Sequence, residues 1–284
     1  MKVETIGVCG AGTMGSGIAQ AAAQAGFNTI LYELNTSVLE KSRSAINSNL
    51  ELLVQKSKID IAEKGNILDR IRFTSDINMC IAHVLIEAIV EKLEAKTALF
   101  NQLAQINNAE TIFATNTSSL PVTAIAKGIV HPERVIGMHF FNPATLMKLV
   151  EVINTEFTST STTDAVIALV KKMGKTPVIC KDSPGFIVNR VARPYYIEAL
   201  RLAEAGADLA QIDRLLENNG FKLGAFKLMD LIGNDINYAV SCSVYEQLGN
   251  PERLKPSFIQ KEKVEKGELG KKSGQGYYNY SNPV

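Results

Sequence analysis

Short apolar runs alternate with amphipathic stretches along the first two thirds of the chain. Residues 3–9 form a run with the length and continuous hydrophobicity of a strand that is buried on both faces. Apolar residues then recur at helical spacing over 14–25, and Gly26 stands where a glycine commonly ends a helix. A second apolar run covers residues 28–32 and ends at an acid, Glu33. This order predicts a strand–turn–helix–strand unit at the start of the chain.

The same alternation continues to about residue 180. Further strands are expected at residues 84–88, 111–115, 135–140, 149–153 and 177–180. Helices are expected at residues 37–56, 60–70, 91–107 and 162–173. The last of these helices has a capping pair at its start, Ser161 with Asp164, and Gly174 beyond its end. Strands and helices in alternation predict an α/β fold with a doubly wound, mostly parallel sheet.

Beyond residue 183 the pattern becomes helical, with helices expected at residues 185–205, 209–218, 226–248 and 256–266. Asp208 and Gln211 form an N-cap pair, and Pro194 is expected to kink the first helix. Gly206 and Gly220 stand at the expected ends of the first two helices. The last segment, 270–280, is basic and then rich in glycine and tyrosine, and it is expected to pack as a final turn. We therefore expect a Rossmann-type domain at residues 1–183 and an all-α domain at residues 184–284.

The turn after the first strand reads Gly10-Ala11-Gly12-Thr13-Met14-Gly15. The spacing is informative because a strand precedes it, a helix follows it, and Glu33 ends the next strand 18 residues after Gly15. In such a turn the first glycine permits the bend, the second lets the backbone approach a pyrophosphate, and the third lets the helix pack on the strand. The N–H groups of the helix N-terminus then attract the phosphates. A carboxylate at position 33 accepts hydrogen bonds from ribose hydroxyls and repels a 2′-phosphate, so the predicted cofactor is NAD rather than NADP.

Composition and charge argue against several other classes of protein. The chain of 284 residues carries 30 Lys and Arg against 29 Asp and Glu, which does not favour a surface for nucleic acid or for anionic membranes. No apolar run reaches the ~18 residues of a transmembrane helix, and no signal peptide is predicted. The four cysteines, Cys9, Cys80, Cys180 and Cys242, lack the paired spacing of metal or redox sites. We therefore expect a cytoplasmic protein with reduced thiols and no metal centre.

The search for a general base is short, because the chain has three histidines, His83, His131 and His139. His83 begins a predicted strand, and His131 precedes Pro132 in a predicted turn. His139 ends the apolar strand at 135–140, and ligands of doubly wound sheets bind beyond the carboxyl ends of the strands. Position alone leaves a catalytic and a structural role equally open for His139. A Ser–His–Asp hydrolase is not favoured, because no G-x-S-x-G motif accompanies it.

Residues 137–143, Gly-Met-His-Phe-Phe-Asn-Pro, resemble the histidine motif of the 3-hydroxyacyl-CoA dehydrogenases. Four other segments resemble that family at the expected places: Asn-Thr-Ser-Ser at 116–119, Lys-Leu-Val-Glu at 148–151, Pro-Gly-Phe-Ile-Val-Asn-Arg at 184–190 and Leu-Gly-Lys-Lys-Ser-Gly-Gln-Gly-Tyr-Tyr at 269–278. The resemblance covers essentially the whole chain. It implies an NAD-dependent oxidoreductase that interconverts (S)-3-hydroxyacyl-CoA and 3-ketoacyl-CoA, and a homodimer that forms through the helical domain.

The resemblance also implies roles for four catalytic residues. His139 would be the general base, and Glu151 would orient its ring and stabilise the imidazolium. Ser118 and Asn189 would hydrogen-bond the substrate oxygen. Each residue has a structural alternative: a surface strand position for Glu151, a helix cap for Ser118 and an ordinary polar position in the first helical turns for Asn189.

Further residues are expected around the cofactor and the CoA group. The cofactor-binding set is Gly10, Gly12, Thr13, Met14, Gly15, Glu33, Glu91, Lys96, Asn116 and Asn142. Glu91 and Lys96 rest on the resemblance, because charged residues on a helix more often form a solvated face. Lys56, near the end of the long second helix, is the candidate for the CoA phosphates, and Lys58 and Lys41 remain alternatives.

The sequence indicates the reaction more clearly than it indicates which acyl chain the substrate carries. A short chain, as in 3-hydroxybutyryl-CoA, is favoured. Residues 228–245 instead resemble the branch of the family that oxidises 3-hydroxyadipyl-CoA in phenylacetate breakdown, whose terminal carboxylate would need a cation in the pocket. The candidate cations are Arg190, Arg193, Lys222 and Lys227. Residues 222–225 read Lys-Leu-Gly-Ala where many family members read Pro-Met-Gly-Pro, so a differently shaped acyl pocket is expected.

Two other kinds of protein share a similar two-domain plan. The 3-hydroxyacid dehydrogenases generally rely on a catalytic lysine in the helical part, so the pair His139 and Glu151 argues against them. A structural lens-type protein need not retain a base, an orienting acid and a dinucleotide loop, which are all present here. A change in NADH absorbance on addition of acetoacetyl-CoA would separate the enzyme from both alternatives.

Overall fold

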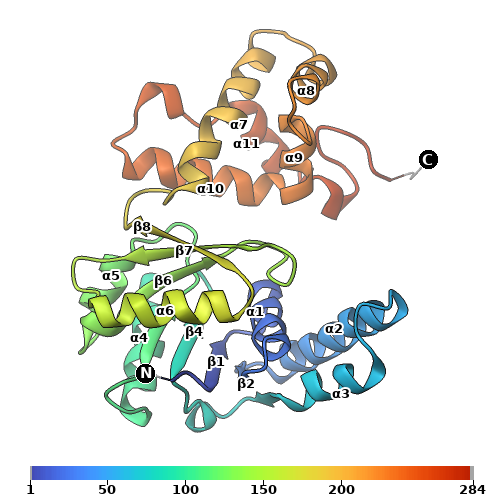
Figure 1. The fold of residues 1–284 in the computed structure, drawn as a ribbon. Helices are drawn as coiled ribbons and strands as arrows, with labels where there is room; N and C mark the ends of the chain where they lie inside the picture. The colour runs from blue at the N-terminus through green and yellow to red at the C-terminus, as the bar shows by residue number, and fades with distance from the viewer. Residues whose placement is uncertain (1, 282–284) are drawn as a thin grey trace. The chain divides into compact units, whose positions relative to one another are not determined.

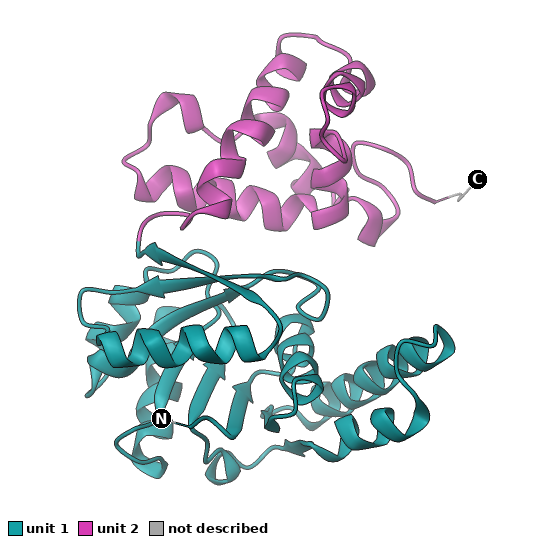
Figure 2. Ribbon diagram, viewed as in Figure 1, with its two compact units in different colours: residues 1–182 teal, residues 183–284 magenta. Residues whose placement is uncertain are grey.

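The computed structural model describes residues 2–281 and divides into two compact units, which meet in the sequence between Asp182 and Ser183 (Figure 2). The first unit contains alternating strands and helices, and the second is helical (Figure 1). The predicted fold class, an α/β unit followed by an all-α unit, is therefore confirmed. None of the helices within residues 2–281 is long and apolar enough to span a membrane.

One sheet runs through the first unit, with its strands in the order β3-β2-β1-β4-β5-β6-β7-β8 (Figure 1). The strands are β1 (Thr5–Cys9), β2 (Asn28–Tyr32), β3 (Ile71–Thr74), β4 (Val84–Glu87), β5 (Ile112–Thr115), β6 (Val135–Phe140), β7 (Leu149–Asn154) and β8 (Thr176–Lys181). Neighbouring strands are parallel except β6 and β7, which are antiparallel. The chain order reverses between β1 and β4, and doubly wound sheets bind dinucleotides at the carboxyl ends of the strands at such a point.

Helices cover both faces of this sheet. They are α1 (Thr13–Gln24), α2 (Thr36–Gln55), α3 (Ile61–Asp69), α4 (Leu93–Ile106), α5 (Val122–Lys127) and α6 (Thr160–Lys172). The larger core joins strand residues such as Val8, Ile86 and Met138 to α1, α2 and α6. The alternate strand residues point to the other face, where Phe113 of β5 and Phe100 of α4 have ring centroids 5.5 Å apart.

The second unit is built from α7 (Val188–Glu204), α8 (Leu209–Asn218), α9 (Ala225–Ile232), α10 (Asn234–Gln247) and α11 (Phe258–Glu265). Its core residues include Tyr196, Leu200, Ile212, Phe226 and Met229. The predicted N-cap of α8 is confirmed, because the Asp208 carboxylate accepts a hydrogen bond from the N–H of Gln211 at 2.9 Å. α7 continues through Pro194.

The predicted final turn is also confirmed, and a buried acid in α9 holds it. The Asp230 carboxylate is fully buried and accepts hydrogen bonds from the N–H groups of Tyr277 and Tyr278, at 3.0 Å each. The Tyr280 hydroxyl donates to the same carboxylate at 3.1 Å. Gly276 passes so close to Asp230 that a Cβ atom there would overlap its side chain. The tail, residues 270–280, therefore packs closely against α9.

Two sequence-based expectations about helix limits are wrong. A single helix was expected over 226–248, but Gly233 adopts a φ of +105° and separates α9 from α10. The N-cap of α6 is Ser159 rather than Ser161, since the Ser159 hydroxyl accepts a hydrogen bond from the N–H of Thr162 at 3.1 Å. The short elements β3 and α5 were not expected.

Candidate active site

The glycine turn lies between β1 and α1, at the point where the strand order reverses. Gly10 has a φ of +102°, and a Cβ atom at this position would lie 2.6 Å from the carbonyl oxygen of Ala88, just after β4. A Cβ atom at Gly15 would overlap the carbonyl oxygen of Gly10. At Gly12 no heavy atom lies within 4 Å of the equivalent position. The turn is therefore packed on its inner side and open at Gly12, which suits the close approach of a pyrophosphate.

Glu33 directly follows β2 and is joined to this turn. Its Oε2 atom accepts a hydrogen bond from the N–H of Ala11 at 3.0 Å, and its Oε1 atom accepts one from the N–H of Asn35 at 3.0 Å. The structure thus brings together the acid and the glycine turn that the sequence singled out. A carboxylate next to the turn is where the ribose of a dinucleotide is held, so these residues fit NAD.

His139 and Glu151 face each other across the antiparallel pair β6 and β7, where they are direct register partners. The His139 Nδ1 and Glu151 Oε2 atoms are 2.6 Å apart, and the exposed fractions of the two side chains are 8% and 1%. The ring of Phe141 lies 4.6 Å from that of His139. A carboxylate at Nδ1 keeps the proton on that nitrogen, so proton exchange with a substrate falls to Nε2.

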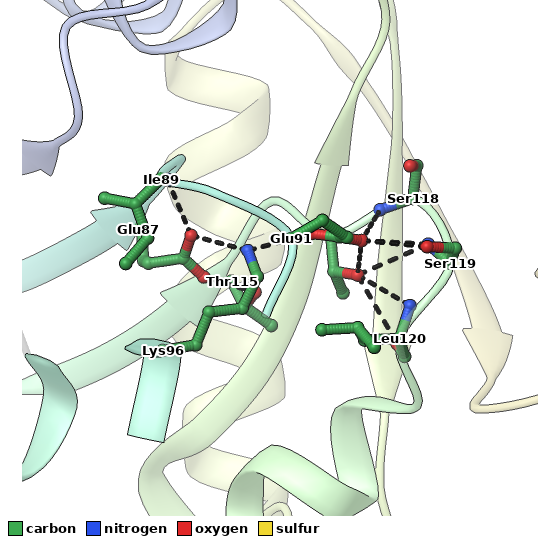
Figure 3. A network of polar contacts seen from close by, with 9 residues as sticks. Glu87, Ile89, Glu91, Lys96, Thr115, Ser118, Ser119 and Leu120 are labelled. Carbon is green, nitrogen blue, oxygen red and sulfur yellow. Dashed lines mark hydrogen bonds and ion pairs between the residues drawn. The ribbon is translucent and has the colours of Figure 1, made fainter. Parts of the chain in front are cut away.

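The loop after β5, residues 116–119, is anchored on two sides. On one side the Asn116 Oδ1 atom accepts a hydrogen bond from the N–H of Phe140 at 2.8 Å, next to His139. On the other side the Glu91 carboxylate accepts hydrogen bonds from the N–H groups of Ser118 and Ser119, at 3.1 and 3.2 Å (Figure 3). The Thr117 and Ser119 hydroxyls donate to the same Glu91 oxygen. Ser118 is therefore held between β4 and β6.

Lys96 lies inside the protein, between two carboxylates. Its Nζ atom is 2.6 Å from Glu87 Oε1 and 3.0 Å from Glu91 Oε2, and its side chain is 1% exposed (Figure 3). Glu87 ends β4, is fully buried, and also accepts hydrogen bonds from the Thr115 hydroxyl at 2.7 Å and the N–H of Ile89 at 2.8 Å. The sequence offered one signal for Glu87, an acid at the end of an apolar strand, but we did not single it out.

A cavity of about 320 Å³ borders the glycine turn within the first unit. Its walls come from the glycine turn, from α1 and α2, and from residues 142–145. Asn142 is among the lining residues, as is Lys41 of α2. Lys56, which follows the last residue of α2, is exposed elsewhere, and Lys58 lines a separate hollow with Ser57 and Asp60. Of the three lysines considered for CoA, Lys41 is thus the one that lines the cavity at the turn.

The loop that carries Asn142 is supported by a lysine that the sequence did not reveal. Lys175 is buried, and its Nζ atom donates to the carbonyl oxygens of Ala144 at 2.5 Å and Met147 at 2.9 Å. Burial lowers the pKa of this ammonium group. No motif signals such a role, because the contact depends on the approach of the start of β8 to the loop after β6.

In the second unit, Asn189 lies in the first turn of α7. Its backbone carbonyl accepts a hydrogen bond from Arg193 Nε at 3.0 Å. Arg193 is buried and also donates to the carbonyl of Asn237 at 3.1 Å and to the Ser241 hydroxyl at 2.7 Å. Burial lowers the pKa of the Arg193 guanidinium to about 10. Its donors are engaged inside the helical unit, which does not suit a substrate carboxylate.

The other three candidate cations for a terminal carboxylate, Arg190, Lys222 and Lys227, differ in their surroundings. Lys227 forms an ion pair with Glu217, with 2.9 Å between Nζ and Oε1. Arg190 and Lys222 are exposed. The structure thus narrows the candidates for a terminal carboxylate from four residues to Arg190 and Lys222.

Comparison with known protein families gives two adjacent matches. Residues 5–183 match the family model "3-hydroxyacyl-CoA dehydrogenase, NAD binding domain". Residues 185–280 match the model "3-hydroxyacyl-CoA dehydrogenase, C-terminal domain". Together the two models account for nearly all of the described chain.

Individual relatives agree with these matches. The chain is 44% identical over 283 residues to the 3-hydroxyadipyl-CoA dehydrogenase of Escherichia coli (strain K12), covering 99% of this chain and 60% of that protein. It is 40% identical to a probable 3-hydroxybutyryl-CoA dehydrogenase of Deinococcus radiodurans, covering 96% of this chain and 99% of the relative. The crystal structure of (S)-3-hydroxybutyryl-CoA dehydrogenase PaaH1 from Ralstonia eutropha has a TM-score of 0.94 and 37% identity, covering 99% of this chain and 100% of that one.

Proposed function

This chain belongs to the 3-hydroxyacyl-CoA dehydrogenase family of NAD-binding oxidoreductases, and from that premise we propose that it interconverts (S)-3-hydroxyacyl-CoA and 3-ketoacyl-CoA thioesters. The observation that carries the proposal is the buried contact between His139 and Glu151 at the carboxyl end of β6. It provides a general base in the same unit as a dinucleotide turn.

His139 takes the proton of the substrate hydroxyl at Nε2 in the oxidative direction and returns it in the reductive direction. The ring gains a positive charge when it accepts the proton, and the Glu151 carboxylate at Nδ1 stabilises that charge. Bound NAD supplies the acceptor for the hydride that leaves the same carbon. Because Glu151 is 1% exposed, little water competes with the ring for this carboxylate.

Ser118 and Asn189 hold the substrate oxygen in line with His139. Support for Ser118 comes from the loop that carries it, which is fastened to Glu91 on one side and to Phe140 on the other. Support for Asn189 comes from its place in the motif at 184–190, which resembles that of the family.

Gly10, Gly12, Thr13, Met14 and Gly15 would hold the cofactor at the turn, Glu33 would accept its ribose hydroxyls, and Asn116 and Asn142 would also contact it. Glu33 accepts two N–H groups at the turn, so its carboxylate is held at the position that selects against a 2′-phosphate. Glu91 and Lys96 belong to the same side of the sheet as Asn116. For the CoA phosphates we propose Lys56, which is exposed at the end of α2. Lys41 lines the cavity at the glycine turn, where the cofactor would bind.

A short acyl chain, as in 3-hydroxybutyryl-CoA, is the favoured substrate. A dicarboxylic chain is the second candidate, because a relative at 44% identity is named for 3-hydroxyadipyl-CoA. Arg190 and Lys222 are then the residues for its terminal carboxylate. A matched charge contributes ~1.5–3 kcal/mol, or about ten- to a hundredfold in kcat/KM.

The test measures NADH oxidation with acetoacetyl-CoA and with 3-ketoadipyl-CoA at matched concentrations. Activity on either thioester supports the reaction, and no activity on any 3-ketoacyl-CoA would exclude it. Equal or better kcat/KM on acetoacetyl-CoA would remove the dicarboxylate candidate. If 3-ketoadipyl-CoA is preferred, Arg190→Gln or Lys222→Gln should abolish the preference, and Lys227→Gln serves as the matched control because Lys227 is already paired with Glu217.

A further inference from the structure

The carboxyl ends of β4 and β5 carry a buried cluster of charges, Glu87, Lys96 and Glu91 (Figure 3). Lys96 is the one basic side chain within residues 2–281 that forms an ion pair with either acid. Two carboxylates share one ammonium group, so the cluster has one excess negative charge if both acids are ionised.

Each of the two acids accepts several hydrogen bonds. Glu87 accepts from the N–H of Ile89, from the Thr115 hydroxyl and from Lys96. One oxygen of Glu91 accepts from two backbone N–H groups and two hydroxyls of the loop 117–119. Burial opposes ionisation of Glu91, but Lys96 and the hydrogen bonds from Thr117, Lys96 and Ser119 outweigh it and hold the pKa of this carboxyl below its usual value.

The cluster holds one cation for two carboxylates in a largely buried place. Glu87 and Lys96 are 0% and 1% exposed, and the side chain of Glu91 is 35% exposed. A further cation placed near Glu91 would therefore interact with a negative charge that water screens only weakly. The structure therefore holds a local preference for positive charge at the open side of Glu91.

The open side of Glu91 would face the nicotinamide half of a bound dinucleotide. A dinucleotide places its adenosine ribose at the acid after β2 and its pyrophosphate at the turn after β1, so its other half extends over β4 and β5. The cluster lies close to the glycine turn, since Gly10 packs against Ala88, the residue after Glu87. The nicotinamide ring is a cation when oxidised and neutral when reduced.

We propose, on the basis of the function proposed above, that the Glu87–Lys96–Glu91 cluster sets the balance between the two redox forms of the bound cofactor. Its excess negative charge favours the oxidised, cationic ring over the reduced, neutral one. Lys96 acts through Glu91: it fixes the second carboxylate at the crevice and limits the cluster to a single excess charge. Neither Glu87 nor Lys96 needs to touch the cofactor for this effect, because Coulomb interactions in a buried site act over several ångströms.

The test compares dissociation constants for NAD⁺ and NADH, measured by calorimetry and by NADH fluorescence without any acyl substrate. Glu91→Gln removes the excess charge and should raise the ratio Kd(NAD⁺)/Kd(NADH) about tenfold, as expected for loss of one charge near a buried ring. Glu87→Gln removes the same charge from a residue that does not contact the loop at 117–119, and it should shift the ratio in the same direction. Glu91→Asp keeps the charge and should keep the ratio within about twofold.

Thr117→Val is the matched control for loop position. The Thr117 hydroxyl donates to Glu91 and accepts from the N–H of Leu120, so its loss loosens the loop and leaves all charges in place. It should weaken both nucleotides alike and leave the ratio unchanged. An unchanged ratio in both Gln variants would overturn the proposal, as would an equal shift in Thr117→Val. If the unaltered chain bound neither nucleotide, the proposed function itself would fail, and the two results are therefore distinguishable.

Discussion

His139 illustrates how much of a proposed role can depend on one neighbour. Its Nδ1 atom lies 2.6 Å from a carboxylate that is almost completely buried, so the ring has a fixed tautomer and a compensated charge when protonated. A histidine with the same backbone position but without Glu151 would lack both. The contact is possible because β6 and β7 are antiparallel and place the two residues directly opposite each other.

Substitution of His139 tests whether this residue is the general base. His139→Gln should lower kcat by about three orders of magnitude while the Kd for NADH changes little, because the amide cannot transfer the proton and the glycine turn is untouched. Steady-state kinetics and NADH fluorescence measure the two quantities. Glu151→Gln should keep the fold and cost less activity. Near-normal turnover in His139→Gln would refute the assignment of the base.

Glu33 governs a different choice, that between NADH and NADPH. Glu33→Ser removes a ribose acceptor and a charge that repels the 2′-phosphate, so the ratio of kcat/KM for NADH over NADPH should fall. The N–H groups of Ala11 and Asn35 also lose their acceptor, so some loss of affinity for both nucleotides is expected. Glu4→Ser, an exposed acid outside the turn, is the control and should leave the ratio unchanged. Equal efficiency of NADPH and NADH with the unaltered chain would contradict this reading.

At the scale of elements, the strands were easier to predict than the helix ends. β2 and β6 have the limits expected from their apolar runs, because buried parallel strands are continuous in hydrophobicity. β3 was missed since its four residues at the sheet edge alternate too briefly to be separated from the preceding helix. α5 was missed for a related reason, because six residues are too few to show a helical period.

The break at Gly233 shows where local sequence stops being sufficient. Apolar positions continue at helical spacing from α9 into α10, and one glycine inside a helix costs only ~1 kcal/mol, so a single helix was expected. Contacts from far along the chain fix the break instead: the N–H of Asn234 donates to the carbonyl of Leu269, and Lys272 packs against Gly233. Lys96 is a similar case, since a charged residue in a helix predicts a solvated face until the position of Glu87 is known.

The tail and α9 can be tested as one element through Asp230. Asp230→Asn replaces a carboxylate that accepts from two N–H groups and a hydroxyl with an amide that has one acceptor oxygen, so buried donors lose their partner. We expect a loss of ~2–4 kcal/mol in the free energy of unfolding and faster proteolysis of the residues after 270. Urea unfolding and limited proteolysis give the two readouts. Asp235→Asn, whose carboxylate is partly exposed and paired with Lys272, is the control and should cost less than ~1 kcal/mol.

At the scale of the whole molecule, each of the two units carries part of the proposed set of residues. His139 and Ser118 belong to the first unit, and Asn189 belongs to the second, only a few residues beyond the point where the chain passes from one to the other. The residues proposed for the cofactor all lie in the first unit, in agreement with the NAD-binding family model over residues 5–183. The change from alternating strands and helices to helices alone is visible in the sequence, close to the point where the two units meet.

The second unit also exposes an apolar side chain on α10. Along α10 the buried positions include Asn234, Asn237 and Ser241, whereas Ile236 is 51% exposed. Three of these buried positions are polar while an isoleucine is exposed, and exposed apolar side chains commonly meet a second copy across a two-fold axis. Together with the family resemblance, this leads us to propose a homodimer that forms through the helical unit.

Light scattering at micromolar concentration should therefore give twice the mass of the chain, and a monomer would count decisively against the proposal. Ile236→Glu should shift the equilibrium toward monomer, because a carboxylate buried between two copies would have no counter-charge. Ile61→Glu is the matched control: Ile61 is 77% exposed at the start of α3 in the first unit, so the same substitution there should leave the dimer intact. If both variants remained dimeric, the interface would have to lie away from α10, and if both became monomeric, the contact would not belong to the helical unit alone.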